Sequence, residues 1–96
     1  MKNALKSIND IAKAIRLVRK SKELSQEAFG VTSSRTYLST LERGLKSPTL
    51  SKIDALAEVM GVHPLTVLVL AYVDVHDEKT VGRMLERIKG EIAAIK

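Results

Sequence analysis

Residues 24–44 carry the side chains in this chain that are best suited to bind a nucleic acid duplex. They read as a short helix, a tight turn and a second helix, which begins with small hydroxyl residues and Arg35. An α-helix fits the major groove of DNA, and the residues at its N-terminal end reach the base edges first. This arrangement predicts a helix that reads a base sequence.

Other polar residues flank this helix at positions suited to phosphate. Gln26 stands at the start of the preceding helix, where free backbone N–H groups and the helix dipole attract an anion. Arg43 and Lys46 follow the second helix and are placed to hold the DNA backbone on its far side. Phosphate contacts fix the register of a protein on DNA, and base contacts specify the sequence. The segment therefore contains both kinds of residue.

The distribution of charge supports a polyanionic partner. The net charge is +5, but residues 1–52 carry +7 and residues 53–96 carry −2. A basic half indicates a face for nucleic acid, with an anionic membrane surface as the competing partner. The three aromatic residues are Phe29, Tyr37 and Tyr72, and the chain offers no sheet or barrel on which they could stack single-stranded bases. Duplex DNA is the better partner.

Enzymatic chemistry has little support in the sequence. The chain lacks cysteine, and it contains neither a glycine-rich phosphate loop nor a serine–histidine–acid set at suggestive spacing. We expect no catalytic residue and no cofactor. Asp74, His76, Asp77 and Glu78 form a small acidic cluster that could ligate a metal, but His63, the other histidine, is thirteen residues from His76. We expect a polar loop that caps the last helix and no metal site.

The length of 96 residues predicts one small domain. The longest apolar run, Leu65 to Val73, is too short to span a bilayer and reads as a buried helix. Met1 to Asp10 lack the apolar run and small-residue cleavage site of a secretory signal. These observations favour a cytoplasmic protein without a membrane partner.

The hydrophobic periodicity is close to 3.6 residues in nearly every segment, which predicts an all-α fold. We expect the N-terminal caps of successive helices at Ser7 with Asp10, Ser25, Ser34, Thr49, His63 before Pro64, and Asp77. Gly44 and Gly61 are expected to end the third and fourth helices.

The expected buried faces follow from the same periodicity. They comprise Ile8, Ile11, Ala12, Ile15 and Val18 in the first helix, Phe29 in the second, Leu38 and Leu41 in the third, and Leu50, Ile53, Leu56, Ala57 and Met60 in the fourth. The fifth helix, from Pro64 to about Val73, is apolar nearly all round, so it must be covered on more than one side.

Several short motifs together resemble a known family. They are Ser25-Gln26-Glu27, Arg35-Thr36-Tyr37-Leu38-Ser39, Leu41-Glu42-Arg43-Gly44, Pro48-Thr49 and the run from Ile53 to Met60. In this combination they resemble the Cro/phage-repressor (XRE-like) helix-turn-helix family over about residues 11–70. Periodicity predicts an additional C-terminal helix in residues 76–96, and the resemblance implies a five-helix repressor-like bundle before it, in residues 7–75. It also implies a sequence-specific transcriptional regulator that binds a double-stranded operator as a dimer, on two half-sites roughly 34 Å apart.

The resemblance also implies a role for individual residues. Ser34, Arg35, Thr36 and Thr40 would face base edges, and Gln26, Ser39, Arg43 and Lys46 would contact phosphate. Arg35 is the strongest candidate, since a bidentate contact to guanine carries roughly 1–3 kcal/mol of discrimination. Arg19 and Glu42 would form an ion pair that locks the first helix against the reading helix.

The spacing departs from the family pattern at one point. Between Gln26 and Arg35 the chain is two residues shorter than the usual family spacing, and Ser33 stands where an aliphatic residue is usual. We expect a shortened second helix and a tilted reading helix, with Val31 supplying the missing apolar contact.

The last helix is the second candidate functional element. A stripe of Val81, Leu85, Ile88, Ile92 and Ile95 runs along one side of it. With Leu65, Leu68 and Tyr72 of the fifth helix, this stripe predicts a homodimer interface. A membrane-bound amphipathic helix is a weaker alternative, because Glu86 and Glu91 offset the basic residues.

A second class of function also remains open. The same bundle could serve as a protein-interaction module, such as an antitoxin or adaptor with secondary DNA binding and an unknown protein partner. Such a module has no need to align Gln26, Arg35, Arg43 and Lys46 on one face.

Overall fold

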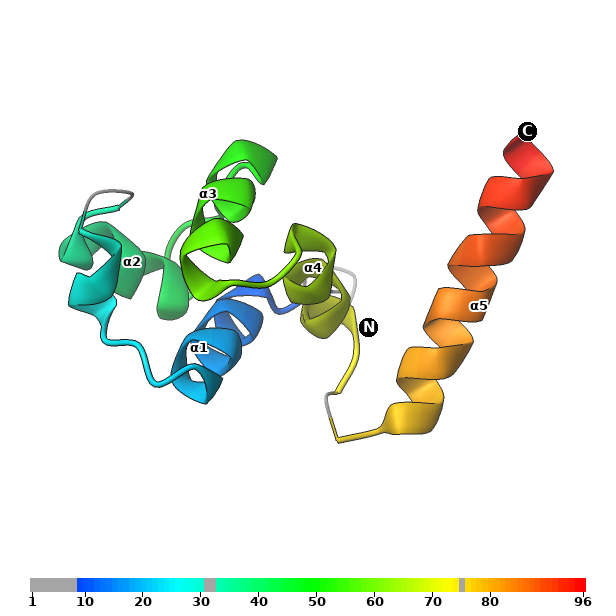
Figure 1. Ribbon diagram of the computed structural model, residues 1–96, viewed down its shortest axis with the longest axis horizontal. Coiled ribbons are helices and arrows are strands. Elements are labelled where there is room, and N and C mark those ends of the chain that lie inside the picture. Colours follow the sequence, from blue (N-terminus) through cyan, green and yellow to red (C-terminus); the bar gives the residue numbers. More distant parts are fainter. Residues whose placement is uncertain (1–8, 31–32, 75) are drawn as a thin grey trace, which may run out of the picture.

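The computed structural model describes residues 9–30, 33–74 and 76–96. In chain order the elements are α1 (Ile11–Ser21), the 3-10 helix η2 (Gln26–Phe29), α2 (Arg35–Glu42), α3 (Leu50–Met60), α4 (Pro64–Tyr72) and α5 (Glu78–Ile95). These ranges contain helices and no strand, so the predicted all-α class is confirmed (Figure 1). The first five elements pack into a bundle, and α5 is the additional C-terminal helix.

Most of the predicted helix caps are present. The side chains that accept a backbone N–H at an N-cap are Asp10 for α1, Ser34 for α2, Thr49 for α3, His63 for α4 and Asp77 for α5. Ser7, the predicted partner of Asp10, lies outside the described residues. The prediction for Ser25 was wrong in detail: it precedes η2, but its side chain accepts no capping bond, and its carbonyl oxygen receives the N–H of Ala28 at 3.1 Å.

Two glycines end helices in the way the sequence predicts. Gly44 and Gly61 have φ angles of +75° and +74°, in the left-handed region that glycine adopts without steric cost. At these angles the chain leaves α2 and α3 in a new direction, and the backbone N–H of each glycine is bonded back to its own helix, to Leu41 and Glu58 respectively. After these turns α3 packs against η2 and α4, and α4 packs against α1.

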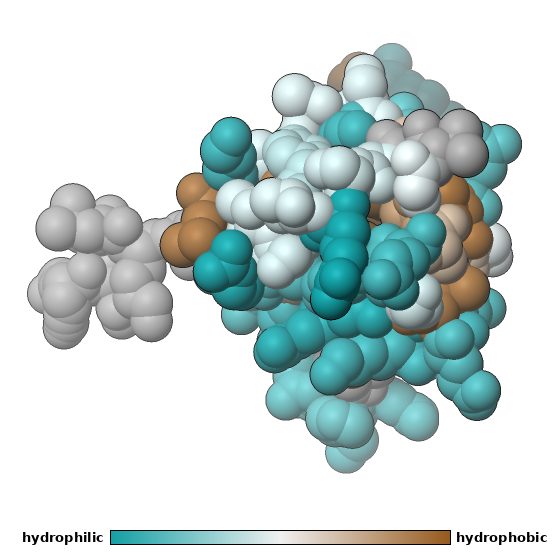
Figure 2. All heavy atoms as spheres, turned by 90° about the vertical axis from the view of Figure 1, so that its left-hand side faces the viewer, coloured by the Kyte–Doolittle hydropathy of each residue, from teal (hydrophilic) through white to brown (hydrophobic). Residues whose placement is uncertain are grey.

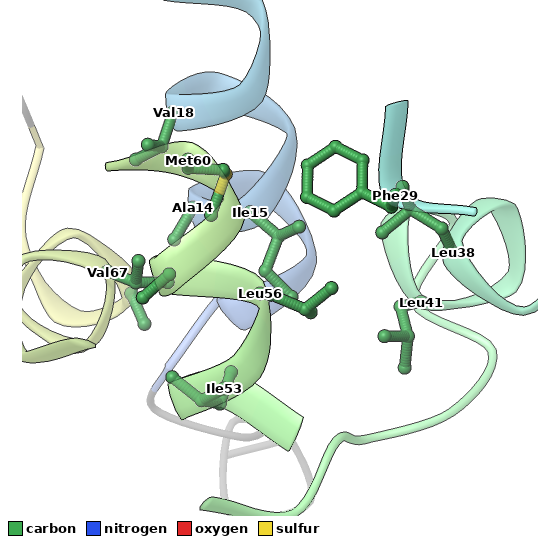
Figure 3. Close-up of a cluster of buried hydrophobic side chains, with 12 residues drawn as sticks. Ala14, Ile15, Val18, Phe29, Leu38, Leu41, Ile53, Leu56, Met60 and Val67 are labelled. Carbon is green, nitrogen blue, oxygen red and sulfur yellow. The ribbon is translucent and has the colours of Figure 1, made fainter. Parts of the chain in front are cut away.

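One hydrophobic core holds the bundle together (Figure 3). Its fully buried members are Ala14, Ile15 and Val18 of α1, Phe29 of η2, Leu38 and Leu41 of α2, Ile53, Leu56, Ala57 and Met60 of α3, and Val67 and Ala71 of α4. In Figure 3, Phe29, Leu38 and Leu41 approach Ile15 and Leu56 from one side. The core therefore fixes η2 and α2 relative to the rest of the bundle.

The predicted core residues were wrong at a few positions. Leu50 is 71% exposed, because it is the first residue of α3 and lies in the turn that extends past the buried cluster. Ile11 and Ala12 are only half-buried, whereas Ala14, which was not predicted, is fully buried. Ile8 and Val31, which were also assigned apolar contacts, lie outside the described residues.

The last helix has a different environment from the others. None of its residues is buried, and Figure 1 shows α5 standing beside α4, away from α1, α2 and α3. Across the described ranges, no single helix is long and apolar enough to cross a membrane. α3 and α4 taken together have the length and apolar composition of a membrane span, but their axes are bent by 110° relative to each other.

Candidate nucleic-acid interface

The connection from η2 sets the position of α2, which the sequence predicts to be the recognition helix and which is called the reading helix. η2 is a single 3-10 turn of four residues, where the sequence predicts a short second helix. The backbone N–H of Ser33 donates to the carbonyl oxygen of Phe29 at 2.7 Å, and Ser33 itself is buried. Because Phe29 is anchored in the core, this bond ties the start of α2 to a fixed point.

Five of the predicted DNA-contacting residues lie together on the surface. Gln26, Arg35, Thr36, Ser39 and Arg43 line one shallow hollow of about 290 Å³ between η2 and α2. The end of the molecule that carries α2 presents mainly hydrophilic and neutral residues, with hydrophobic residues towards its margins (Figure 2). Polar groups of this kind are able to form hydrogen bonds with a nucleic-acid backbone.

The first turn of α2 is exposed at its leading end. Ser34, Arg35 and Thr36 are all exposed to solvent. The hydroxyl oxygen of Ser34 accepts the backbone N–H of Tyr37 at 3.0 Å, which leaves its own O–H able to donate. The hydroxyl of half-buried Thr40 donates to the carbonyl oxygen of Thr36 at 2.8 Å. Towards a partner molecule, the Thr40 oxygen can therefore only accept a hydrogen bond.

Arg35 has an acidic neighbour that spacing did not predict. Its Nη1 atom lies 3.5 Å from Oε2 of Glu27, and both side chains are 69% exposed. Glu27 belongs to η2, one residue after Gln26. The pair therefore connects the two elements on the same side of the molecule as the hollow.

Gln26 is less free than the sequence suggested. Its amide nitrogen Nε2 donates to Oε1 of Glu42 at 3.1 Å, and the residue is half-buried. It still lines the hollow, so a phosphate there would meet a side chain that is already oriented by Glu42. The spacing of 16 residues across a turn gave no signal for this contact.

The predicted ion pair between Arg19 and Glu42 is present and buried. Nε of Arg19 lies 2.6 Å from Oε2 of Glu42, and Nη2 lies 2.8 Å from Oε1. The remaining nitrogen, Nη1, donates to the carbonyl oxygen of Leu24 at 2.8 Å. The hydrogen bonds and charge of Glu42 raise the pKa of Arg19 above its ordinary value, although burial acts in the opposite direction. This network joins α1, the loop before η2 and α2.

The basic residues after the reading helix remain accessible. Arg43 is exposed, and its Nε atom donates to the carbonyl oxygen of Ser39 at 3.4 Å. Lys46 is exposed in the loop beyond Gly44. Sequence reasoning missed one further cation: the ammonium group of Lys52 on α3 lies 5.3 Å from the centre of the Tyr37 ring, at a distance typical of a cation–π contact.

The acidic segment before α5 is occupied by local hydrogen bonds. The backbone N–H of His76 donates to Asp74 at 2.8 Å, and Asp77 accepts from the backbone and hydroxyl of Thr80. These hydroxyl and backbone bonds of Thr80 lower the pKa of Asp77 below its ordinary value. Within the described residues, no group of three or more potential metal ligands lies together.

The bundle and its exposed reading helix define a helix-turn-helix DNA-binding protein. Residues 15–67, more than half of the chain, match the model of the helix-turn-helix family of XRE type. The chain belongs to this family and is a DNA-binding transcriptional regulator. It is also similar to control protein C.BamHI of Bacillus amyloliquefaciens, with 39% identity over 57 residues, which cover 56% of this chain and 70% of the relative. No solved structure matches the chain significantly.

Proposed function

We propose that this protein binds a palindromic DNA operator as a homodimer and represses transcription or regulates its own promoter. The observation that carries the DNA-reading part is the gathering of Gln26, Arg35, Thr36, Ser39 and Arg43 around one exposed hollow. Their elements are held in place by the core and by the Arg19–Glu42 pair. The similar protein is named a control protein, which supports a regulatory role.

The base contacts are assigned to the first turns of α2. Arg35 has the reach and the paired N–H donors to recognise guanine in the major groove, and Ser34, Thr36 and Thr40 offer shorter hydroxyl contacts. Gln26 and Ser39 line the polar hollow between η2 and α2, whereas Arg43 is the C-cap residue of α2 and Lys46 lies in the loop that follows. We assign these four residues to phosphate, because they flank the reading turn on both sides.

The homodimer is assigned to the surface formed by α4 and α5. Only Val67 and Ala71 of α4 are buried, although the helix is apolar nearly all round. The proposed interface consists of Leu65, Leu68, Tyr72, Val81, Leu85, Ile88, Ile92 and Ile95. Of these, Leu65, Tyr72, Leu85, Ile88, Ile92 and Ile95 are exposed to water, and their burial would supply the driving force for association.

A second copy is the occupant that this surface fits best. Leu65, Val69, Leu70, Val81 and Leu85 provide most of the lining of a mainly apolar hollow of about 540 Å³ between α4 and α5. The exposed stripe of α5 continues beyond it to Ile92 and Ile95. A two-fold dimer needs a surface that complements itself, and here an apolar helix stripe and an apolar hollow lie side by side on one chain.

Selection from a random duplex pool tests the DNA-binding part. The wild-type chain should enrich a palindromic sequence, with an affinity that falls steeply as salt rises, because phosphate contacts release counterions. The Arg35→Ala variant should lose preference at one base position in each half-site. A pool that shows no enrichment, or an Arg35→Ala variant with the same preference as the wild type, would contradict the assignment.

The exposed stripe of α5 also favours a second candidate, a protein-interaction module with secondary DNA binding. In that case α5 would hold a different protein, and the chain would remain monomeric alone. Sedimentation at tens of micromolar separates the two candidates, because only the first predicts a dimer in the absence of any partner.

A further inference from the structure

Glu27 is an acidic side chain placed against a residue that we assign to base recognition. Its carboxylate lies 3.5 Å from Nη1 of Arg35, on the side of the molecule that carries the polar hollow. A carboxylate at a DNA-facing surface repels phosphate, so its placement lowers the affinity for DNA in general. The proposed function gives this residue no role.

The pair contributes little to the stability of the fold. Both side chains are largely exposed, and solvent screens such a pair until it contributes almost nothing to folding. Glu27 is nevertheless well positioned, because Phe29 of the same 3-10 turn is fully buried and Gln26 is hydrogen-bonded to Glu42 of α2. The backbone of η2 thus places the Glu27 side chain within reach of Arg35.

The geometry leaves part of the guanidinium group free for a base. Glu27 engages Nη1, and the edge formed by Nε and Nη2 retains its two parallel N–H donors. Those two donors match the O6 and N7 acceptors of guanine. When DNA excludes water from the interface, the attraction between the carboxylate and the guanidinium strengthens, because the local dielectric constant falls.

We propose that Glu27 is a positioning residue that sets sequence specificity by holding Arg35 towards the base edges and away from the phosphates. An arginine without this neighbour would be drawn to the nearest phosphate of any sequence. Glu27 therefore lowers the affinity for DNA of any sequence and raises the discrimination between sequences. This proposal rests on the proposed function, since it assumes that α2 reads duplex DNA.

The test compares the affinities for the selected operator and for a random duplex at several salt concentrations. Glu27→Ala should bind the random duplex more tightly than the wild type and should lower the ratio of operator to random affinity about tenfold. Glu27→Gln should also bind random DNA more tightly, but should retain part of the ratio because its amide oxygen can still accept from Arg35. Glu86→Ala, an exposed acid on α5, is the control with the same change of charge and should leave the ratio unchanged.

A double variant isolates the action through Arg35. If Glu27 acts by positioning Arg35, Glu27→Ala should not lower the ratio further in an Arg35→Ala background. If the wild type selects an operator, two outcomes would overturn the proposal. One is a double variant whose ratio falls by the combined losses of the two single variants; the other is an unchanged ratio in both Glu27 variants. A wild type that selects no sequence would overturn the proposed function along with it. Thermal unfolding should be the same in all single variants at residue 27, which excludes a folding defect as the cause.

Discussion

Arg19 and Glu42 form a two-point ion pair, with N–O distances of 2.6 and 2.8 Å, that connects α1 to the last residue of α2. Their side chains are 10% and 4% exposed. Gln26 donates to the same carboxylate, and Leu24 accepts from the same guanidinium. The reading helix is therefore fixed at its C-terminal end by buried electrostatics, and its N-terminal turn is left open.

Removing the carboxylate of this pair should destabilise the fold. Glu42→Ala leaves the guanidinium of Arg19 buried without its partner, at a cost of about 3 kcal/mol in the free energy of unfolding. Urea and thermal unfolding measure the loss, and Glu58→Ala, an exposed acid on α3, controls for the change in net charge. An unchanged thermal midpoint in Glu42→Ala would show that the pair is not buried in solution.

The cap of α5 should respond to acid. The pKa of Asp77 is lowered by its bonds to Thr80, so its stabilising effect is complete above the unfolded-state value of 3.8 and is lost as pH falls through the folded value. We expect the Asp77 carboxyl to titrate below 3.8 in an NMR experiment, with fraying of the first turn of α5 at the same pH. Thr80→Ala removes the hydroxyl bond, the largest cause, and should move the midpoint upward; an unmoved midpoint would contradict the assignment.

The pKa of Arg19 is shifted in the opposite direction to that of Asp77, and this shift does not affect stability at acidic or neutral pH. Hydrogen bonds to Glu42 raise the pKa of Arg19 above its ordinary, already strongly basic value, so its contribution to stability is complete at acidic and neutral pH and is lost only in strong alkali. Acid sensitivity in this protein should therefore not arise from the guanidinium of Arg19.

The helices were predictable because their signals are local. Ser34, Thr49 and Asp77 cap their helices by bonding to a backbone N–H three residues ahead, and Gly61 ends α3 by its own backbone freedom. Burial was less predictable where it depends on the position of an element within the bundle. Leu50 follows the apolar periodicity of α3 but lies beyond the core. The periodicity of a helix does not indicate where along its length the core ends.

The site was predictable in composition but not in its internal contacts. The polar residues of α2 and η2 could be named from helix spacing and family resemblance. The contact of Gln26 with Glu42 and that of Glu27 with Arg35 could not, because both depend on the angle at which the shortened η2 meets α2. That angle is set by the burial of Phe29, a tertiary property.

Two glycine substitutions should have opposite effects on stability. Gly61→Ala places a side chain at a φ of +74°, which costs about 1 kcal/mol even though no atom lies within 4 Å of the added Cβ. Gly82→Ala in α5 meets equally open space in a helical backbone, so it should raise helix content. Circular dichroism and thermal unfolding measure both changes. Equal signs would mean that one of these backbone conformations differs in solution.

The apolar stripe of α5 should control association without affecting the bundle. Ile92→Glu places a charge on the stripe and should shift the proposed dimer to monomer in sedimentation, because a desolvated carboxylate has no partner there. Ala94→Glu adds the same charge on the opposite side of the helix and should remain dimeric. Both should unfold at the wild-type temperature when compared as monomers, since no residue of α5 is buried. Identical behaviour of the two variants would exclude the stripe as the interface.

The loop after α2 should control the salt dependence of DNA binding, separately from its specificity. Lys46 is exposed beyond Gly44, where its ammonium group can reach phosphate but is distant in sequence from the reading turn. A phosphate contact releases about 0.9 counterion, so Lys46→Ala should reduce the slope of log affinity against log salt by about that amount for each protomer bound. It should weaken operator and random duplexes alike, whereas Arg35→Ala should weaken chiefly the operator. Arg83→Ala on α5 removes the same charge far along the chain and should leave the slope unchanged. If Lys46→Ala altered the base preference instead, the loop and not α2 alone would read the DNA.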